Sequence, residues 1–259
     1  MKVNALLAQV PITWNIEDNL ATVSTVLQNA NSGELVVMPE GMISGYDDRL
    51  SGLNNLNRDE LLRAVDQIAS MVKERGLHLF CGTLLPDDAG CYNAAIYFSP
   101  SGDREIYRKV NLATHERSLL IAGSSLPVIY LQFEEGRVAV NPQLCRDVRF
   151  PDQWHCPARC GAQIFAYLTY AANPSESRSV WRSHLISRAA ETQRFVIATN
   201  VAHTDGHCPT LVVSPKGDII AEIFDTETSI IRTCIEVDEV SDWYIDQQRS
   251  DVIQIDYLK

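Results

Sequence analysis

Three residues whose types could support nucleophilic catalysis each follow a stretch that predicts a β-strand. They are Glu40 after residues 36–38, Lys109 after residues 105–107, and Cys145 after residues 138–140 and a short connection at 141–144. Because α/β folds place active sites at the carboxyl ends of their strands, we expect the three side chains to gather there. The sequence therefore predicts a site that combines a carboxylate, an ammonium group and a thiol.

The chemistry that these groups could do together is thiol-based acyl transfer. A thiol with an ordinary pKa of about 8.5 is only slightly ionised at neutral pH, so a catalytic cysteine needs a base or a nearby cation. Glu40 could be the base and Lys109 the cation. Each residue alone also has an ordinary interpretation: Cys145 as a core thiol, Glu40 as a turn residue before Gly41, and Lys109 as a solvated surface charge.

Length and composition predict one enzyme-sized unit over residues 1–259. The chain is 46% hydrophobic and has no Pro/Gly/Ser-rich linker, so a single domain can bury a large core. The net charge of -11 opposes binding to nucleic acid and to anionic membranes. The N-terminus does not resemble a secretion signal, and no apolar run reaches the roughly 18 residues of a membrane helix, so we expect a cytoplasmic protein.

The seven cysteines do not resemble a disulfide framework, because their number is odd and the chain is long. We expect reduced thiols. The only cluster that suggests a metal contains His155, Cys156 and Cys160, and it lacks a second pair of ligands with zinc-like spacing. We therefore expect no metal and no cofactor, since the nucleophile, the base and the oxyanion donors can all come from protein.

Apolar patterns and turn signals predict alternating strands and helices. Asn57 is a predicted helix cap and Gly76 a predicted helix end. The expected helices are 16–30, 58–75 and 180–193, and the expected strands are 3–9, 35–38, 77–83, 94–98, 105–107, 138–140, 164–169, 195–200, 210–213, 219–223 and 230–236. This pattern predicts a layered α/β domain with two stacked sheets.

The order, spacing and flanks of Glu40, Lys109 and Cys145 resemble the nitrilase superfamily of carbon-nitrogen hydrolases over nearly the whole chain. Further segments match the family pattern: Gly45-Tyr46, Gly161-Ala162, Ala172-Asn173, Arg188-Ala189-Ala190-Glu191 and Asn200. The resemblance implies a four-layer α-β-β-α sandwich. It also implies a homodimer or a higher homo-oligomer, with the helix 180–193 at the contact.

The resemblance implies a role for each site residue. Cys145 attacks a carbonyl or nitrile carbon, Glu40 transfers the proton, and Lys109 with the backbone N–H of Arg146 stabilises the oxyanion. Glu116, seven residues after Lys109, matches the family's second glutamate and is expected to hold a position for Glu40, Lys109 or substrate.

The flank of Cys145 looks more like the amidase branches, including omega-amidase-like members, than like nitrilases, which carry Cys-Trp-Glu. We therefore expect hydrolysis of a small amide through a thioester, with release of ammonia. Arg146, Tyr46 and Asn173 are the expected substrate-binding residues, and Arg146 would favour a carboxylate. The loop 203–207 is expected to shape the pocket. The alternatives are an N-carbamoyl amidohydrolase, a nitrilase, or a catalytically silent binding protein.

Overall fold

Two six-stranded sheets form the centre of the computed structural model, which describes residues 1–223 and 225–247. The first sheet has the order β12-β1-β2-β3-β4-β5, with β12 Ser229–Glu236, β1 Lys2–Gln9, β2 Leu35–Val37, β3 His78–Asp87, β4 Gly90–Phe98 and β5 Arg104–Arg108. The second has the order β11-β10-β9-β8-β7-β6, with β11 Ile219–Ile223, β10 Thr210–Val213, β9 Phe195–Thr199, β8 Ile164–Leu168, β7 Gly136–Leu144 and β6 Ile129–Phe133.

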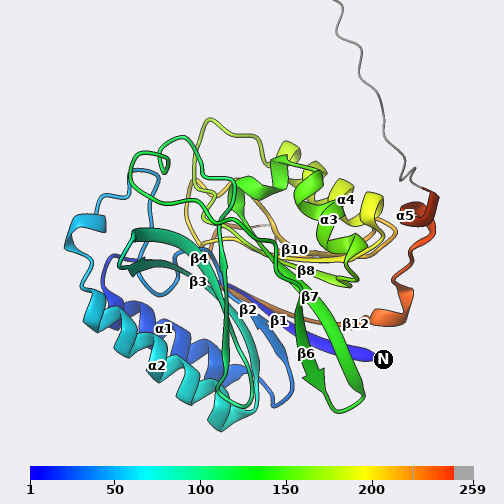
Figure 1. Ribbon diagram of the computed structural model, residues 1–259, viewed down its shortest axis with the longest axis horizontal. Coiled ribbons are helices and arrows are strands. Elements are labelled where there is room, and N and C mark those ends of the chain that lie inside the picture. The colour runs from blue at the N-terminus through cyan, green and yellow to red at the C-terminus, as the bar shows by residue number, and fades with distance from the viewer. Residues whose placement is uncertain (224, 248–259) are drawn as a thin grey trace, which may run out of the picture.

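Helices cover the outer face of each sheet (Figure 1). The helices α1 (Ile16–Asn29) and α2 (Arg58–Arg75) pack on the first sheet, and α3 (Asp152–Arg159) and α4 (Arg178–Thr192) pack on the second. Short helical segments at Leu53–Asn55, Cys145–Arg149 and Val237–Glu239, together with α5 (Trp243–Gln247), complete the described structure. The expected four-layer α-β-β-α sandwich is confirmed.

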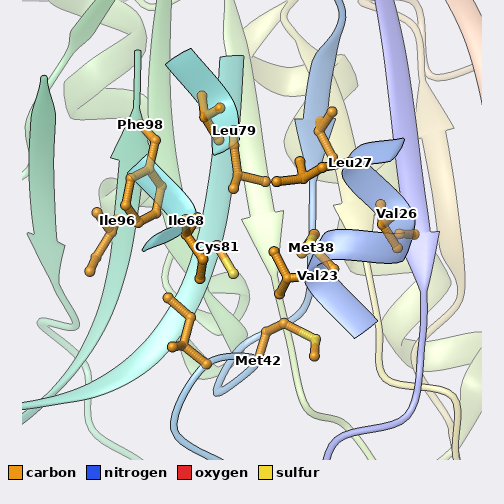
Figure 2. Close-up of a cluster of buried hydrophobic side chains, with 14 of the residues drawn as sticks. Val23, Val26, Leu27, Met38, Met42, Ile68, Leu79, Cys81, Ile96 and Phe98 are labelled. Carbon is orange, nitrogen blue, oxygen red and sulfur yellow. The ribbon is translucent and has the colours of Figure 1, made fainter. Parts of the chain in front are cut away.

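Three apolar layers hold the four structural layers together. Figure 2 shows the layer between the first sheet and its helices, where Val23 and Leu27 of α1 and Ile68 of α2 face Leu79 and Phe98. A second layer fills the space between the sheets, and a third packs α3 and α4 against the second sheet. Burial of this apolar surface is the main stabilising contribution to the fold.

The ends of α2 follow from local sequence signals. The side chain of Asn57 accepts hydrogen bonds from the backbone N–H groups of Asp59 and Glu60, which have no partner inside the helix. Gly76 ends the helix in the left-handed region at φ 65°, where a residue with a side chain is strained. Both predicted ends of this helix are confirmed.

The strand directions bring several chain segments to one edge of the molecule. The strands β1, β2 and β3 pair in parallel in the first sheet, and β7, β8 and β9 do so in the second. Because parallel strands end at the same edge, the residues after β2, β7 and β8 lie near one another.

Within the described residues, no helix has both the length and the apolar character needed to cross a bilayer.

The structure differs from the sequence prediction at three elements of this framework. The strand β7 continues through Pro142 to Leu144, where a connection was expected, and Pro142 pairs with Ala166 of β8. The strand β6 and the helix α3 were not predicted. Because β7 continues to Leu144, Cys145 follows a strand directly and is the first residue of the turn.

Candidate active site

Glu40 and Lys109 form a buried ion pair. Glu40 follows the strand β2 and Lys109 follows β5, so both belong to the first sheet. The Nζ atom of Lys109 lies 2.8 Å from Oε1 of Glu40, and neither side chain is exposed to solvent. The backbone of Lys109 is fixed on both sides, because its N–H donates to the carbonyl of Asn93 and its own carbonyl accepts from the N–H of Gly123.

Glu116 is the second carboxylate at this lysine. The ammonium group of Lys109 lies 3.0 Å from the Glu116 carboxylate. The backbone N–H of Ala113 donates to Oε2 of Glu116 at 2.6 Å, and the hydroxyl of Tyr46 donates to Oε1 at 2.9 Å. The structure therefore brings the predicted Glu116 together with Glu40 and Lys109 in one buried cluster.

Asn93 joins both carboxylates, and the sequence analysis did not find it. Its amide Nδ2 lies 2.7 Å from Oε1 of Glu40 and 2.6 Å from Oε1 of Glu116. Asn93 lies in β4, where the following residues are apolar and buried. A polar side chain inside a buried strand was the available signal, because such a group needs a hydrogen-bond partner.

The turn that carries Glu40 packs directly against Gly82 of β3. A Cβ atom at position 82 would lie 2.4 Å from Cα of Glu40 and 2.6 Å from the carbonyl oxygen of Pro39. The backbone N–H of Gly82 donates to that same carbonyl at 3.1 Å. The absence of a side chain at position 82 thus determines where the backbone of Glu40 lies.

Cys145 comes from the second sheet, at the end of β7, and begins the helical segment Cys145–Arg149. Its φ of 36° lies in the left-handed region, which costs free energy for a residue with a side chain and turns the chain sharply. The hydroxyl of Tyr167 donates to the carbonyl of Cys145 at 2.8 Å. Asp147 supports the same turn by accepting the N–H of Leu144 at 2.9 Å and the hydroxyl of Tyr107 at 2.7 Å.

A hydrogen bond across the sheets joins the two halves of the site. The backbone N–H of Tyr170, which follows β8 of the second sheet, donates to Oε2 of Glu40 at 2.8 Å. Lys109 and Asn93 occupy the other oxygen of Glu40. The carboxylate is therefore held in one orientation by groups from both sheets.

The electrostatics of the cluster favour a neutral thiol beside a charged lysine. Burial raises the pKa of the Cys145 thiol to about 12, and the charge of Glu40 adds to this effect while that of Lys109 opposes it. Burial alone would lower the pKa of Lys109, but the carboxylates of Glu40 and Glu116 outweigh it and the pKa is raised. For Glu116, burial is outweighed by Lys109 and Asn93, so its pKa is lowered. Such perturbed groups in a cleft are typical of functional sites.

A cavity of 280 Å³ opens next to Cys145. Its lining residues are Tyr46, Asp48, Ala113, His115, Cys145, Arg146, Tyr170, Ala171, Ala172, Asn173, Glu176, Trp181 and His207. All three residues that the sequence suggested for substrate binding, Tyr46, Arg146 and Asn173, are among them. The volume suits a small molecule rather than a polymer.

His184 and the cysteine cluster lie outside this arrangement, whereas His115 and His207 line the cavity. His184 is half-buried on α4, and its Nε2 lies 3.0 Å from a guanidinium nitrogen of Arg149. Cys156 and Cys160 are exposed thiols. Among residues 1–223 and 225–247, no group of three or more His, Cys, Asp or Glu side chains is arranged to hold a metal ion.

The chain matches a known protein family over almost its whole length. The family described as "Carbon-nitrogen hydrolase" matches residues 5–245, which include every site residue named above. A hydrolase encoded in the agr operon of Staphylococcus aureus is 29% identical over 227 residues, covering 85% of this chain and 82% of that protein. A 2-oxoglutaramate amidase of Bacillus subtilis is 28% identical over 222 residues, covering 82% of each chain.

Solved structures share the fold. A mutant of an amidase from Nesterenkonia sp. AN1, with the acetamide moiety of fluoroacetamide covalently added at its active-site cysteine, matches with a TM-score of 0.80. The identity is 20%, and the match covers 96% of this chain and 94% of that chain. At this identity the likeness concerns the arrangement of the sheets and helices.

Proposed function

The chain belongs to the carbon-nitrogen hydrolase family, and we propose that it hydrolyses a small amide with Cys145 as the nucleophile and releases ammonia. The observation that carries this proposal is the buried cluster of Glu40, Lys109 and Glu116 beside the cavity that Cys145 lines. The amidase names of similar proteins support the amide over other carbon-nitrogen bonds.

The first half of the reaction forms an acyl-enzyme. A thiol with a raised pKa needs a base at the moment of attack, and Glu40 is the proposed base. The sulfur forms a bond to the amide carbon while Glu40 takes the thiol proton. The carbon-nitrogen bond then breaks, and Glu40 returns the proton to the departing nitrogen, so that ammonia leaves and a thioester remains.

The second half of the reaction releases the acid. Glu40 takes a proton from water while the water oxygen bonds to the thioester carbon. The carbon-sulfur bond then breaks, and Glu40 returns the proton to the departing sulfur, which gives a carboxylic acid and the free thiol. In both halves Lys109 and the backbone N–H of Arg146 face the oxyanion, a contribution of roughly 3–4 kcal/mol for each donor in comparable sites. Glu116 keeps Lys109 charged and in place. No step requires a cofactor.

Substrate binding is assigned to the cavity residues. The guanidinium group of Arg146 recognises a carboxylate, because its donors match that geometry. Asn173 forms part of the wall, and Tyr46 acts through Glu116 and His115, to which its hydroxyl is hydrogen-bonded. The preferred substrate is therefore a small amide that also carries an acidic group.

Two other enzyme activities and one non-enzymatic function are the alternatives. An N-carbamoyl carbonyl or a nitrile carbon would suit the same nucleophile, and the 280 Å³ cavity would admit either. A silent binding protein would have no physical reason to retain a buried lysine between two carboxylates, because desolvating three charges costs free energy.

A homodimer is the proposed assembly, with α4 at its contact. This helix exposes Val180, and Phe150 and Ile220 are further large apolar side chains that reach solvent. Light scattering coupled to gel filtration should give twice the chain mass, and Val180→Asp should shift it toward the monomer. A monomeric wild type would contradict the proposal.

The cytoplasm is the proposed location. All seven cysteines are free thiols, including the exposed Cys156, Cys160 and Cys234, and such thiols persist where the compartment is reducing. Fractionation of the native host, followed by immunodetection, tests this; recovery outside the cytoplasmic fraction would contradict it.

Ammonia release from matched substrates tests the function. The panel contains simple amides, ω-amides of dicarboxylic acids, N-carbamoyl acids and nitriles, with Cys145→Ala alongside the wild type. Release from amides that vanishes in Cys145→Ala supports the proposal. Release only from N-carbamoyl compounds or nitriles selects one of the alternatives, and no release from any class favours a binding protein.

A further inference from the structure

One ring nitrogen of His207 accepts a hydrogen bond, and the other has no hydrogen-bond partner among the described residues. Its side chain is 6% exposed and lines the same cavity as Cys145. The backbone N–H of Asn173 donates to Nδ1 of His207 at 2.9 Å. The Nε2 atom is buried, and no residue of the described structure forms a hydrogen bond with it.

The bond from Asn173 determines which nitrogen of His207 carries the proton. Because Nδ1 accepts, it has no hydrogen, and in a neutral imidazole the proton must be on Nε2. Burial lowers the pKa of His207, which keeps the ring neutral. The Nε2–H group is therefore a hydrogen-bond donor with a defined direction.

The ring has little freedom to turn away. The backbone N–H of His207 donates to the carbonyl of Ala171 at 3.0 Å, which fixes the chain at this point. The ring centroids of Trp181 and His207 are 5.2 Å apart, and the two rings meet edge to face. A fixed, buried donor without an acceptor costs free energy, so its retention beside a cavity points to an acceptor on the ligand.

Arg146 supplies a second group for the same acceptor. Among residues 1–223 and 225–247, no carboxylate forms an ion pair with its side chain, whereas the nearby Arg149 is paired with Glu176 at 3.1 Å. A guanidinium group without an ion-pair partner and a neutral N–H donor that line one cavity suit a carboxylate, which can accept from both. The exposed Asp48 also lines this cavity; burial raises its pKa, and the charge of Arg146 opposes this effect.

We propose that His207 is a specificity-determining residue whose Nε2–H donates to the carboxylate of the substrate, beside Arg146. The inference rests on the proposed function in one respect: the amide group of that substrate lies at Cys145 while its carboxylate lies at His207. It assigns a specific role to one residue of the loop 203–207, which the sequence analysis expected only to shape the pocket.

Two substitutions test the roles of the two ring nitrogens of His207 independently. In His207→Asn the side-chain oxygen can replace Nδ1 as the acceptor for Asn173, but no donor remains at the position of Nε2. In His207→Gln the amide nitrogen can replace Nε2 as the donor, but the acceptor at Nδ1 is lost. Both are made in a Cys145→Ala background, so that binding is measured without turnover.

The probes are succinamate and glutaramate, each compared with its neutral diamide by calorimetric titration. We expect His207→Asn to weaken binding of the carboxylate form about tenfold or more, the range for a hydrogen bond to a charged group, and to change binding of the diamide by less than about threefold. His207→Gln should keep most of the preference for the carboxylate form.

Three results would overturn the proposal: no binding of either carboxylate probe, equal losses for both members of a pair, or a larger loss in His207→Gln than in His207→Asn. The last result would mean that His207 serves only to anchor Asn173. These titrations do not depend on catalysis, so a failure of the wild type to release ammonia would contradict the proposed function without deciding the role of His207.

Discussion

Lys109 lies 2.8 Å from Glu40 with both side chains fully buried, and the same ammonium group lies 3.0 Å from Glu116. One cation thus compensates two carboxylates inside the protein. Removing one partner from such a buried network is more costly than removing an exposed pair, because the remaining charges cannot be solvated. The lysine is therefore required for stability as well as for the proposed chemistry.

Lys109→Met should lower the free energy of unfolding by about 3–5 kcal/mol, since two buried carboxylates lose their cation. Urea denaturation followed by circular dichroism measures the change. Lys2→Met is the matched control, because Lys2 pairs with Glu236 on the surface and should contribute less than about 1 kcal/mol. Equal losses in the two variants would contradict the importance of the buried cluster.

Glu40→Gln should make the thiol of Cys145 more reactive while it abolishes turnover. The negative charge of Glu40 helps to raise the pKa of that thiol, so its removal lowers the pKa and increases the thiolate fraction at pH 8. Alkylation of Cys145 by iodoacetamide, followed by peptide mass spectrometry, should accelerate about 3–10-fold, with the exposed Cys156 as an internal control. Slower alkylation would mean that Glu40 already accepts the thiol proton in the free protein.

Gly82→Ala should reduce kcat at least tenfold, because the new Cβ atom would lie 2.4 Å from Cα of Glu40 and displace the carboxylate. Gly33→Ala is the control: at φ 80° it carries the backbone cost of about 1 kcal/mol, but no atom lies within 4 Å of its Cβ position. Comparison of kcat and of thermal stability in both variants makes the test. If both lose activity in proportion to stability, the positioning argument for position 82 fails.

The free energy of unfolding should fall as the pH rises from about 4 to about 6, because the buried carboxyl of Asp147 loses its proton over this range. Burial raises the pKa of its carboxyl from 3.8 to about 6, so between these values the folded state binds a proton that the unfolded state has released. The stabilisation is complete below the unfolded pKa and is lost above the folded one, a change of about 3 kcal/mol. Asp147→Asn cannot titrate, so urea denaturation of both proteins across this range should give diverging curves. Parallel curves would contradict the raised pKa.

Helix ends were predictable from sequence because their signals are local. The helix α2 begins after Asn57 and ends at Gly76, as expected. The Asn57 side chain accepts hydrogen bonds from backbone N–H groups in the first turn, and Gly76 adopts the left-handed conformation that ends the helix. The helix α3 was missed for a local reason as well, because it contains Pro157, which interrupts the usual pattern. The edge strand β6 was also missed. Pro142 likewise concealed the continuation of β7.

The catalytic candidates were predictable as residue types with family-like spacing, but their partners were not. Asn93 contacts both carboxylates only because β4 lies beside β3 and β5 in the folded sheet. The donor at His207 depends on a backbone hydrogen bond from Asn173, 34 positions earlier in the chain. Neither contact leaves a signal in the neighbouring sequence, because both arise from tertiary packing.

Glu40 and Lys109 belong to the first sheet and Cys145 to the second, so the proposed base and the proposed nucleophile meet only at the interface between the two sheets. Either sheet formed alone would present a thiol without a base, or a base without a thiol. The proposed activity therefore requires the two sheets to pack together. The hydrogen bond from the backbone N–H of Tyr170 to Oε2 of Glu40 joins them at this point. During synthesis, a partly folded chain would therefore lack the proposed activity, although its Cys145 thiol would ionise more readily than the buried thiol of the folded protein.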